Sequence, residues 1–584
     1  MKYRSHQRRA QQAAGALGDV HCTGARAGGG HPQTPAGGDW SRGETATQPR
    51  LSAASNTIQS WHTFFVSVTH DSFTREWVWL LALAVLHTSW RLWAFVIHPR
   101  LRPRAIAEVP YMIPFLGHTL AMFKDTASLV RHGICYFGGS YEPFSIRLLG
   151  ERIYVVSSPD DAATVYKDST SFSWDAYMDR LLKAFGLSEK AREISWAKPS
   201  LVNQNDHMKT INPQFKSLVH LIEHIYKIQL LPGEQLDLLR HSILSMLDKN
   251  LTWANLNQRY VLEFGIEYRR ISVKTLCAFL ITDSTTRGMF GDLMFEYEPN
   301  LYNHMRTFND DSWACVFNVP KIFTPRLNRA RNILCSAMRR YIRTPKELRK
   351  GGAWSVRAII EAVDCFGMDE DSQVAMLFMI WWAAHSNTIN ACFWLLCNVA
   401  YNETLVDALL KETSPAFRGT AIDIPYLMHD CPLLDSAYLE VLRLVNGAFS
   451  IRKVQQDTEV SGRVLRAGNT LVIPYRELHS NPNVWGESTT RFDPERFLQQ
   501  PKLAAHPSYR PFGGGVSYCP GRNLAKAEVC GFVAAFINRF QISVPLGSTG
   551  EPQAFPLLDT TKPSTGITGC MPDMDLYLDI KPRV

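Results

Sequence analysis

The sequence predicts a mainly α-helical protein with small β-sheets and an N-terminal transmembrane anchor. Apolar residues follow a helical period through most of residues 205–412. β-branched and aromatic residues gather in short runs bounded by glycine at 144–156 and 462–473. One apolar stretch near the N-terminus, residues 77–97, is long enough to cross a bilayer.

Composition and charge exclude several classes of protein. The chain has 584 residues, of which 46% are hydrophobic and 20% charged, as in ordinary globular proteins. A formal net charge of +8 is mild for this length and gives no indication of nucleic-acid binding. A basic face could still dock an acidic protein partner. Twelve cysteines are scattered without a C-x-x-C pair, so neither a zinc cluster nor a disulfide framework is expected. They predict reduced, buried thiols in a cytosol-facing protein.

The N-terminal part divides into an extension and an anchor. Residues 1–70 are basic and rich in Gly, Ala, Gln and Thr without an apolar period, which predicts disorder. A transit peptide and an overextended gene model are the alternatives. Residues 75–98 are predicted to span the membrane, with Arg91 snorkelling at the far end. The basic cluster at 100–104 follows and places the bulk of the chain in the cytosol. The alternative is a buried or interfacial helix.

A proline-rich hinge at 99–118 and one large body at 119–584 come next. Spaced prolines stiffen the hinge, which is expected to hold the body at a set angle to the membrane. Residues 144–156 predict a β-hairpin around Gly150, and Ser158 before Pro159 predicts a helix start.

The most informative segment is a cysteine loop, residues 512–522, which reads FGGGVSYCPGR. Its glycines permit positive φ and a close approach to a flat, bulky group. Pro520 and Gly521 open a helix after Cys519, and free N–H groups there are expected to lower the thiol pKa. A thiolate is the axial ligand that a haem iron needs for O–O cleavage. The segment lacks the endings of phosphate loops, and a nucleophilic cysteine with a distant His remains the rival interpretation.

This loop resembles the F-x-x-G-x-R/H-x-C-x-G signature of the cytochrome P450 family, through Phe512, Gly515, Cys519 and Gly521. The resemblance covers roughly 105–584. It implies the cytochrome P450 fold and a thiolate-ligated heme b (haem), whose iron is bound by Cys519. Ser517 replaces the usual Arg or His, so one contact to a haem propionate is expected to be missing.

Two further segments match the family in order. Glu440 and Arg443 lie three apart on a predicted helix and share a face, which by itself indicates only a surface ion pair. The resemblance adds Arg496, from 492–497, as the third member of a buried structural triad. It also implies that Arg452 binds a propionate, with a solvated strand residue as the alternative, and that Phe449 and Ser450 face the substrate.

A long apolar helix at 374–400 carries a polar cluster at mid-length, which suggests a ligand-facing groove. Thr388 occupies the position of the threonine that lines the oxygen pocket in the family. Asn387 stands where the family usually has Asp or Glu, and His385 stands where it often has Gly. Asn387 is expected to orient a water and Thr388 to relay a proton. The Asn-Thr pair is similar to that of cholesterol 7α-hydroxylase and prostacyclin synthase.

The resemblance implies a membrane-bound monooxygenase that inserts one oxygen atom of O2 into a lipophilic terpenoid, sterol or polyketide, as in secondary metabolism. Electrons would come from NADPH through cytochrome P450 reductase at the endoplasmic reticulum, with the catalytic domain in the cytosol. The alternatives are an isomerase or dehydratase acting on a peroxide without external electrons, and a haem-binding sensor.

Overall fold

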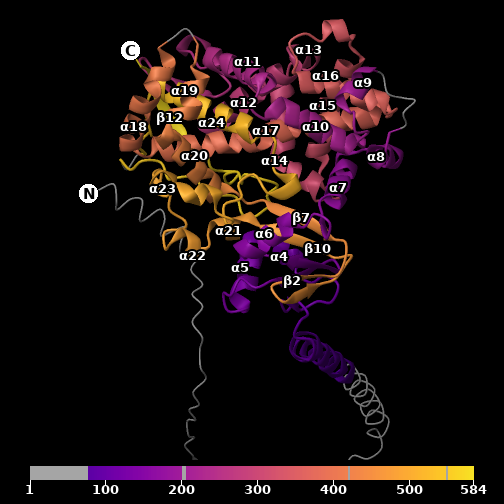
Figure 1. Ribbon diagram of the computed structural model, residues 1–584. Coiled ribbons are helices and arrows are strands. Elements are labelled where there is room, and N and C mark those ends of the chain that lie inside the picture. The colour runs from indigo at the N-terminus through magenta and orange to yellow at the C-terminus, as the bar shows by residue number, and fades with distance from the viewer. Residues whose placement is uncertain (1–76, 200–205, 419–420, 548–549, 584) are drawn as a thin grey trace, which may run out of the picture.

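The computed structural model describes residues 77–199, 206–418, 421–547 and 550–583. The predicted extension 1–70 and the first two residues of the predicted anchor lie outside the described residues. Figure 1 shows a body of long helices above a smaller part built on a sheet. The longer helices are α5 Thr126–Tyr136, α6 Pro159–Lys167, α7 Asp175–Phe185, α10 Leu218–Leu230, α11 Glu234–Asn250, α12 Val273–Phe290, α14 Leu301–Val316, α15 Pro325–Arg343, α16 Trp354–Cys365, α17 Glu370–Ala400, α18 Glu403–Thr413, α20 Pro432–Val445 and α24 Arg522–Arg539. The predicted mainly helical fold with small sheets is confirmed.

One helix in the described ranges, Trp77–Leu101, is long and apolar enough to cross a membrane, and none of it is buried in the body. It includes a π-helical turn at Trp93–Ile97. The guanidinium of Arg91 donates to the carbonyl of Tyr111 at 2.6 Å. The His87 ring lies 2.7 Å from the carbonyl of Met112. Both polar interruptions of the apolar helix therefore bond to the hinge.

The main sheet has six strands in the order β1-β2-β3-β10-β7-β4. The strands are β1 Ala107–Glu108, β2 Phe144–Leu148, β3 Glu151–Val155, β4 Phe172–Ser173, β7 Phe449–Val454 and β10 Thr470–Pro474. The predicted hairpin is β2 and β3, which pair antiparallel around Gly150 at φ +84°. Ser158 caps α6 by accepting from the N–H of Asp161. Strand β7 alternates in burial, so Phe449 and Ser450 lie on opposite faces of the strand.

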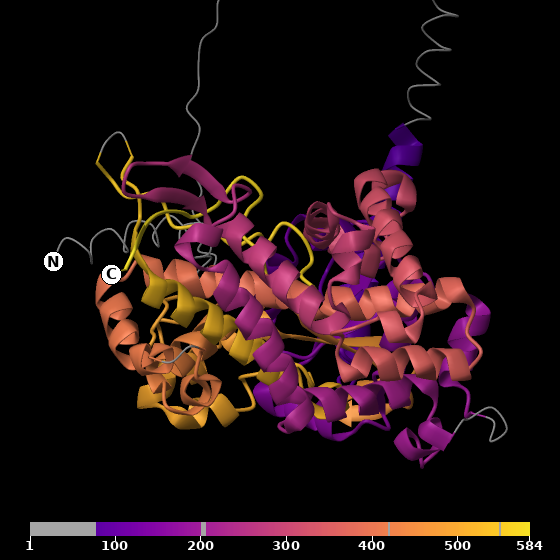
Figure 2. The same cartoon turned by 90° about the horizontal axis from the view of Figure 1, so that it is seen from above.

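A second sheet has the order β11-β12-β6-β5 and joins the chain's C-terminal strand to its middle. Its strands are β5 Val261–Phe264, β6 Arg269–Ser272, β11 Phe540–Ser543 and β12 Tyr577–Pro582. The β5–β6 hairpin interrupts the region that the sequence predicts as mostly helical, and it lies beside the C-terminus in Figure 2. A separate pair, β8 Thr458–Val460 and β9 Arg463–Leu465, completes the described strands.

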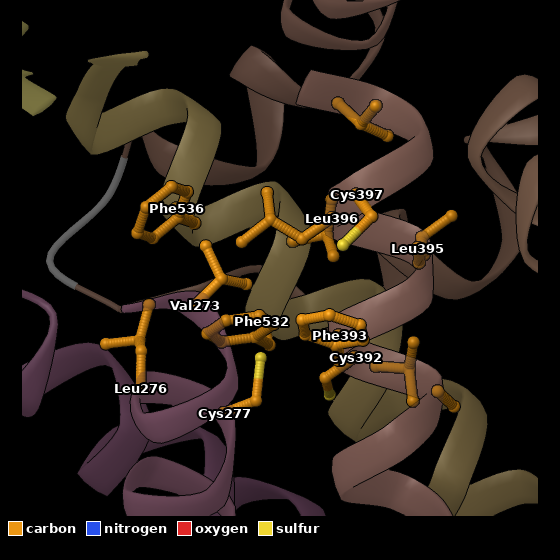
Figure 3. Close-up of a cluster of buried hydrophobic side chains, with 14 of the residues drawn as sticks. Val273, Leu276, Cys277, Cys392, Phe393, Leu395, Leu396, Cys397, Phe532 and Phe536 are labelled. Atoms are coloured by element: carbon orange, nitrogen blue, oxygen red, sulfur yellow. The ribbon is translucent and has the colours of Figure 1, made fainter. Parts of the chain in front are cut away.

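The largest hydrophobic core lies between α12, α17 and α24 (Figure 3). Cys277 of α12 and Cys392 and Cys397 of α17 contribute thiols to it, and burial raises their pKa well above the ordinary value. These cysteines act as small apolar side chains. Because α17 and α24 pack on each other, the polar cluster of α17 is held against the helix that follows the cysteine loop.

Candidate functional site

The cysteine loop is closed by its own backbone. The N–H of Cys519 donates to the carbonyl of Phe512 at 3.0 Å, and a short 3-10 turn, Gly515–Ser517, lies between them. Gly521 precedes the first residue of α24. A Cβ at Gly521 would stand 3.8 Å from the Cys519 sulfur, so glycine keeps the space beside that sulfur open. The chain thus presents a sulfur just before a helix of eighteen residues.

The glycines of this loop make a close approach to Tyr166 of α6. Gly513 and Gly515 have φ of +81° and +59°, which L side chains rarely adopt. A Cβ at Gly515 would lie 2.6 Å from the Tyr166 carbonyl, and one at Gly514 would lie 3.1 Å from its ring. The sequence predicts that a flat, bulky group lies against these glycines. In the structure, the close neighbour of Gly514 and Gly515 is Tyr166.

The electrostatic setting of Cys519 differs from the expectation of a lowered thiol pKa. Burial raises the pKa of the Cys519 thiol, although the backbone N–H groups of Gly521 and Arg522 and the charge of Arg522 lower it. Burial outweighs these favourable groups because a charge loses its hydration in the interior. In the protein alone the sulfur therefore favours the protonated form.

Arg452 lies next to the cysteine loop, and no described carboxylate pairs with it. Its side chain is 2% exposed, and its Nη2 donates to the Ser517 hydroxyl at 2.5 Å. The guanidinium packs over the rings of Tyr166 and Trp174, and no described carboxylate lies within ion-pair distance. A buried cation without an anion is costly. The residues present therefore fit a group that brings its own carboxylates to this place, as a haem does with its propionates.

The structure brings the three triad residues together and buries them. Both carboxylate oxygens of Glu440, which is fully buried, accept from Arg443 at 2.7 and 2.8 Å and from Arg496 at 3.1 Å. Arg443 also donates to the carbonyls of His479 and Thr489. The cluster is thus a buried, fully bonded charge network and not the surface pair that the spacing alone indicates.

His479 connects the triad to the cysteine loop, and the sequence analysis missed it. Its Nε2 accepts from the backbone N–H of Arg510 at 2.9 Å, so the proton lies on Nδ1, which faces the Arg443 carbonyl at 3.2 Å. Burial and the charge of Arg443 lower the pKa of His479 to about 3, so the ring is neutral. No local pattern around a single histidine could have revealed this bridge.

Helix α17 is buried along most of its length but open in the middle. Ala383, Ala384, Asn387 and Asn390 keep accessible surface among buried neighbours. The Oδ1 of Asn387 accepts from the backbone N–H of Ile567 at 2.8 Å, which uses one of the two lone pairs of that oxygen. A Cβ on Gly566 would lie 1.9 Å from that same oxygen. Asn387 therefore fastens the C-terminal loop to α17.

Thr388 reaches a carboxylate that the sequence analysis did not single out. Its hydroxyl donates to Glu528 of α24 at 3.5 Å, and the hydroxyl of Thr285 of α12 donates to the other oxygen at 2.7 Å. Glu528 is 2% exposed, and burial raises its pKa to about 7. One signal could have found it: a lone acid on the apolar face of the helix that follows Cys519.

His385 fills the position where a glycine was expected. Its Nε2 lies 3.1 Å from the Thr286 hydroxyl of α12, and its Nδ1 lies 2.5 Å from the Trp381 carbonyl. Burial lowers the pKa of His385 to about 4, which makes the ring neutral at physiological pH. The imidazole joins α17 to α12.

Comparisons with known proteins agree with this geometry. A family model for cytochrome P450 matches residues 300–568. The chain is 22% identical to the cytochrome P450 monooxygenase poxD of Penicillium oxalicum, over 78% of this chain and 91% of that protein. It is 24% identical to the cytochrome P450 monooxygenase nodJ of Hypoxylon pulicicidum, over 81% and 89%. Among solved structures, the retinoic acid-bound cyanobacterial CYP120A1 superposes with a TM-score of 0.60 at 17% identity, covering 82% of this chain and 99% of that one.

Proposed function

The chain belongs to the cytochrome P450 family and is a monooxygenase, and from this premise we propose that it oxidises a lipophilic small molecule with Cys519 as the haem ligand. The observation that carries the assignment is the pairing of two features at one place. A sulfur stands before α24 with space beside it, and an unpaired guanidinium, Arg452, lies next to the same loop.

These residues would hold the haem as follows. Cys519 would bind the iron, Arg452, held by the hydroxyl of Ser517, would receive a propionate, and Phe512, Gly515 and Gly521 would shape the loop. When bound, the haem supplies the thiolate-ligated iron at which O2 is activated. The triad of Glu440, Arg443 and Arg496 supports the loop through His479 and Arg510.

On the α17 side, the chain's own groups would handle the proton. The Thr388 Oγ1 proton points to Glu528, a carboxyl that burial keeps partly protonated at neutral pH. We assign to Thr388 the transfer of a proton from Glu528 toward the oxygen pocket. Asn387 would orient a water in the oxygen pocket and also positions the loop at Ile567, whose N–H its Oδ1 accepts.

The membrane and the electron donor belong to the same proposal. Residues 75–98 would anchor the catalytic domain, residues 119–584, on the cytosolic side of the endoplasmic reticulum, and residues 99–118 would form the hinge; the apolar helix Trp77–Leu101 supports this. The electron donor would be NADPH–cytochrome P450 reductase. A cavity of about 520 Å³ beside the cysteine loop, lined by Arg510, Arg522 and Lys526 together with Asp435, supports docking of an acidic partner there. The substrate would be a terpenoid, sterol or polyketide of secondary metabolism.

The test uses membranes that contain the full chain, the reductase and NADPH, incubated in air with a lipid panel. We expect oxygenated products and, after reduction, the red-shifted carbon monoxide band of a thiolate-ligated haem. Cys519→Ala should abolish that band, whereas Cys335→Ala on α15 should keep it. Turnover of a peroxide substrate at full rate without NADPH would favour an isomerase, and a band unchanged in Cys519→Ala would refute the assignment.

A further inference from the structure

A guanidinium without a carboxylate partner lines a second, smaller cavity, away from Arg452. Arg476 belongs to α21, Tyr475–His479, and its Nη2 donates to the Thr568 hydroxyl at 3.0 Å. No carboxylate in the described ranges lies within ion-pair distance of Arg476. Burial lowers the pKa of its guanidinium. Because a desolvated cation is costly without an anion, a carboxylate bonded directly to Arg476 would stabilise it.

Two acidic side chains line the same cavity, and neither lies within ion-pair distance of Arg476 in the described ranges. Glu477 has an Oε1 without a hydrogen-bond partner, and burial raises its pKa, which favours the protonated carboxyl. Asp559 accepts from the N–H and the hydroxyl of Thr561. Lys562 also lines the cavity and pairs with Asp311 at 3.9 Å, and Asp125 and Arg131 act on Arg476 with opposite signs. The protonated Glu477 could donate to an incoming anion.

The cavity itself has room beside Arg476 and is mostly apolar elsewhere. Its volume is about 20 Å³, enough for one water-sized group. Val130, Phe449 and Pro474 form its apolar wall. A Cβ at Gly447 would lie 2.3 Å from the Thr568 hydroxyl and 3.2 Å from Arg476 Nη2, so glycine at this position keeps the guanidinium accessible.

This cavity adjoins a much larger one. A cavity of about 510 Å³ lies against α14 and α17 and is lined by Asn387 and Asn390. Four residues of the C-terminal loop line both cavities: Asp559, Lys562, Ser564 and Thr568. The loop that Asn387 fastens to α17 therefore also forms the wall at Arg476.

We propose that Arg476, with Lys562 beside it, binds the carboxylate of the substrate, which is therefore a lipophilic carboxylic acid. This inference rests on the proposed function, since it names the substrate class of the same enzyme. A planar carboxylate matches the fork of a guanidinium, and the apolar wall at Phe449 suits the carbon chain next to it.

The experiment measures binding to the haem-loaded full chain in detergent by calorimetry. The probes are saturated fatty acids of eight to sixteen carbons and their methyl esters. We expect the acids to bind at least about tenfold more tightly than the esters. Formate, which carries the carboxylate alone, should compete with the acids and not with the esters.

Variants locate the carboxylate. Arg476→Met should weaken acid binding at least about tenfold and leave ester binding unchanged. Arg476→Lys should restore part of the loss, and Lys562→Met should cost less than Arg476→Met. The control is Arg331→Met on α15, whose guanidinium donates to the Phe185 carbonyl and makes no described ion pair.

Equal binding of acids and esters in the wild-type protein would overturn the inference, as would acids that bind no tighter than about 1 mM. Equal losses in Arg476→Met and Arg331→Met would also overturn it. The wild-type comparison and formate competition do not depend on how Arg476→Met folds. The carbon monoxide band of the same samples tests the haem assignment separately, so failure of one claim is distinguishable from failure of the other.

Discussion

Replacing Glu528 by glutamine should remove a pH dependence from the stability of the protein. Glu528 is buried with two threonine hydroxyls and without a described cation, and its pKa is about 7 against an ordinary value of 4.5. Between pH 4.5 and 7 the unfolded chain has released this proton while the folded protein still binds it. The free energy of unfolding therefore falls as the pH rises through this range.

The size of the effect follows from the difference between the two pKa values. At 1.36 kcal/mol for each unit of pKa, the loss is about 3 kcal/mol between pH 4.5 and pH above 7. A folded body of roughly 460 residues has an unfolding entropy of about 1 kcal/mol/K, so the melting temperature should fall by about 3 °C from this group. Glutamine has nearly the same shape and no proton to lose, so the variant should lack this component.

The assay is thermal unfolding of the haem-loaded protein in detergent at several pH values between 5 and 8, followed by circular dichroism. We expect the melting temperature of Glu528→Gln, relative to the wild type, to rise by about 3 °C across this range. Glu193→Gln, an exposed carboxylate on α8, Glu189–Trp196, is the control and should show no such trend. A difference between Glu528→Gln and the wild type that does not change with pH would refute the reasoning.

Three other variants test the rest of the site. Glu440→Gln leaves its two arginine partners buried without a carboxylate and should lower the free energy of unfolding by about 3–5 kcal/mol in thermal denaturation; a loss under about 1 kcal/mol would contradict the network. Gly515→Ala forces a methyl group toward the Tyr166 carbonyl at a positive φ, at a backbone cost of about 1–3 kcal/mol. The variant should therefore have a lower haem content, measured by absorbance. Unchanged haem content would contradict the loop geometry. Asn387→Ala should speed hydrogen exchange of the Ile567 amide about fivefold, as expected for one lost hydrogen bond of about 1 kcal/mol, whereas Asn387→Asp, which keeps an acceptor, should not.

The elements that the sequence predicts correctly depend on interactions within a few residues. Helix α6 begins where Ser158 can cap it, and the hairpin β2–β3 turns at a glycine with positive φ. The long helix α17 lies within a few residues of the predicted 374–400, and α20 and α24 lie where helices are predicted, at Glu440 and after Gly521. The family resemblance rests on residues close together in the chain, so it too is visible without a structure.

The sequence by itself determined the cysteine loop, the periodic helices and the apolar helix near the N-terminus, because each depends on local spacing. Only the tertiary structure decided the partners across long separations: Ile567 for Asn387, Tyr166 against Gly515, and β12 beside β6. Apolar periodicity shows which face of a helix is buried, but the packing of helices decides which polar groups meet there. Glu528 is the clearest case, since its pKa depends on burial and on two hydroxyls contributed by other helices.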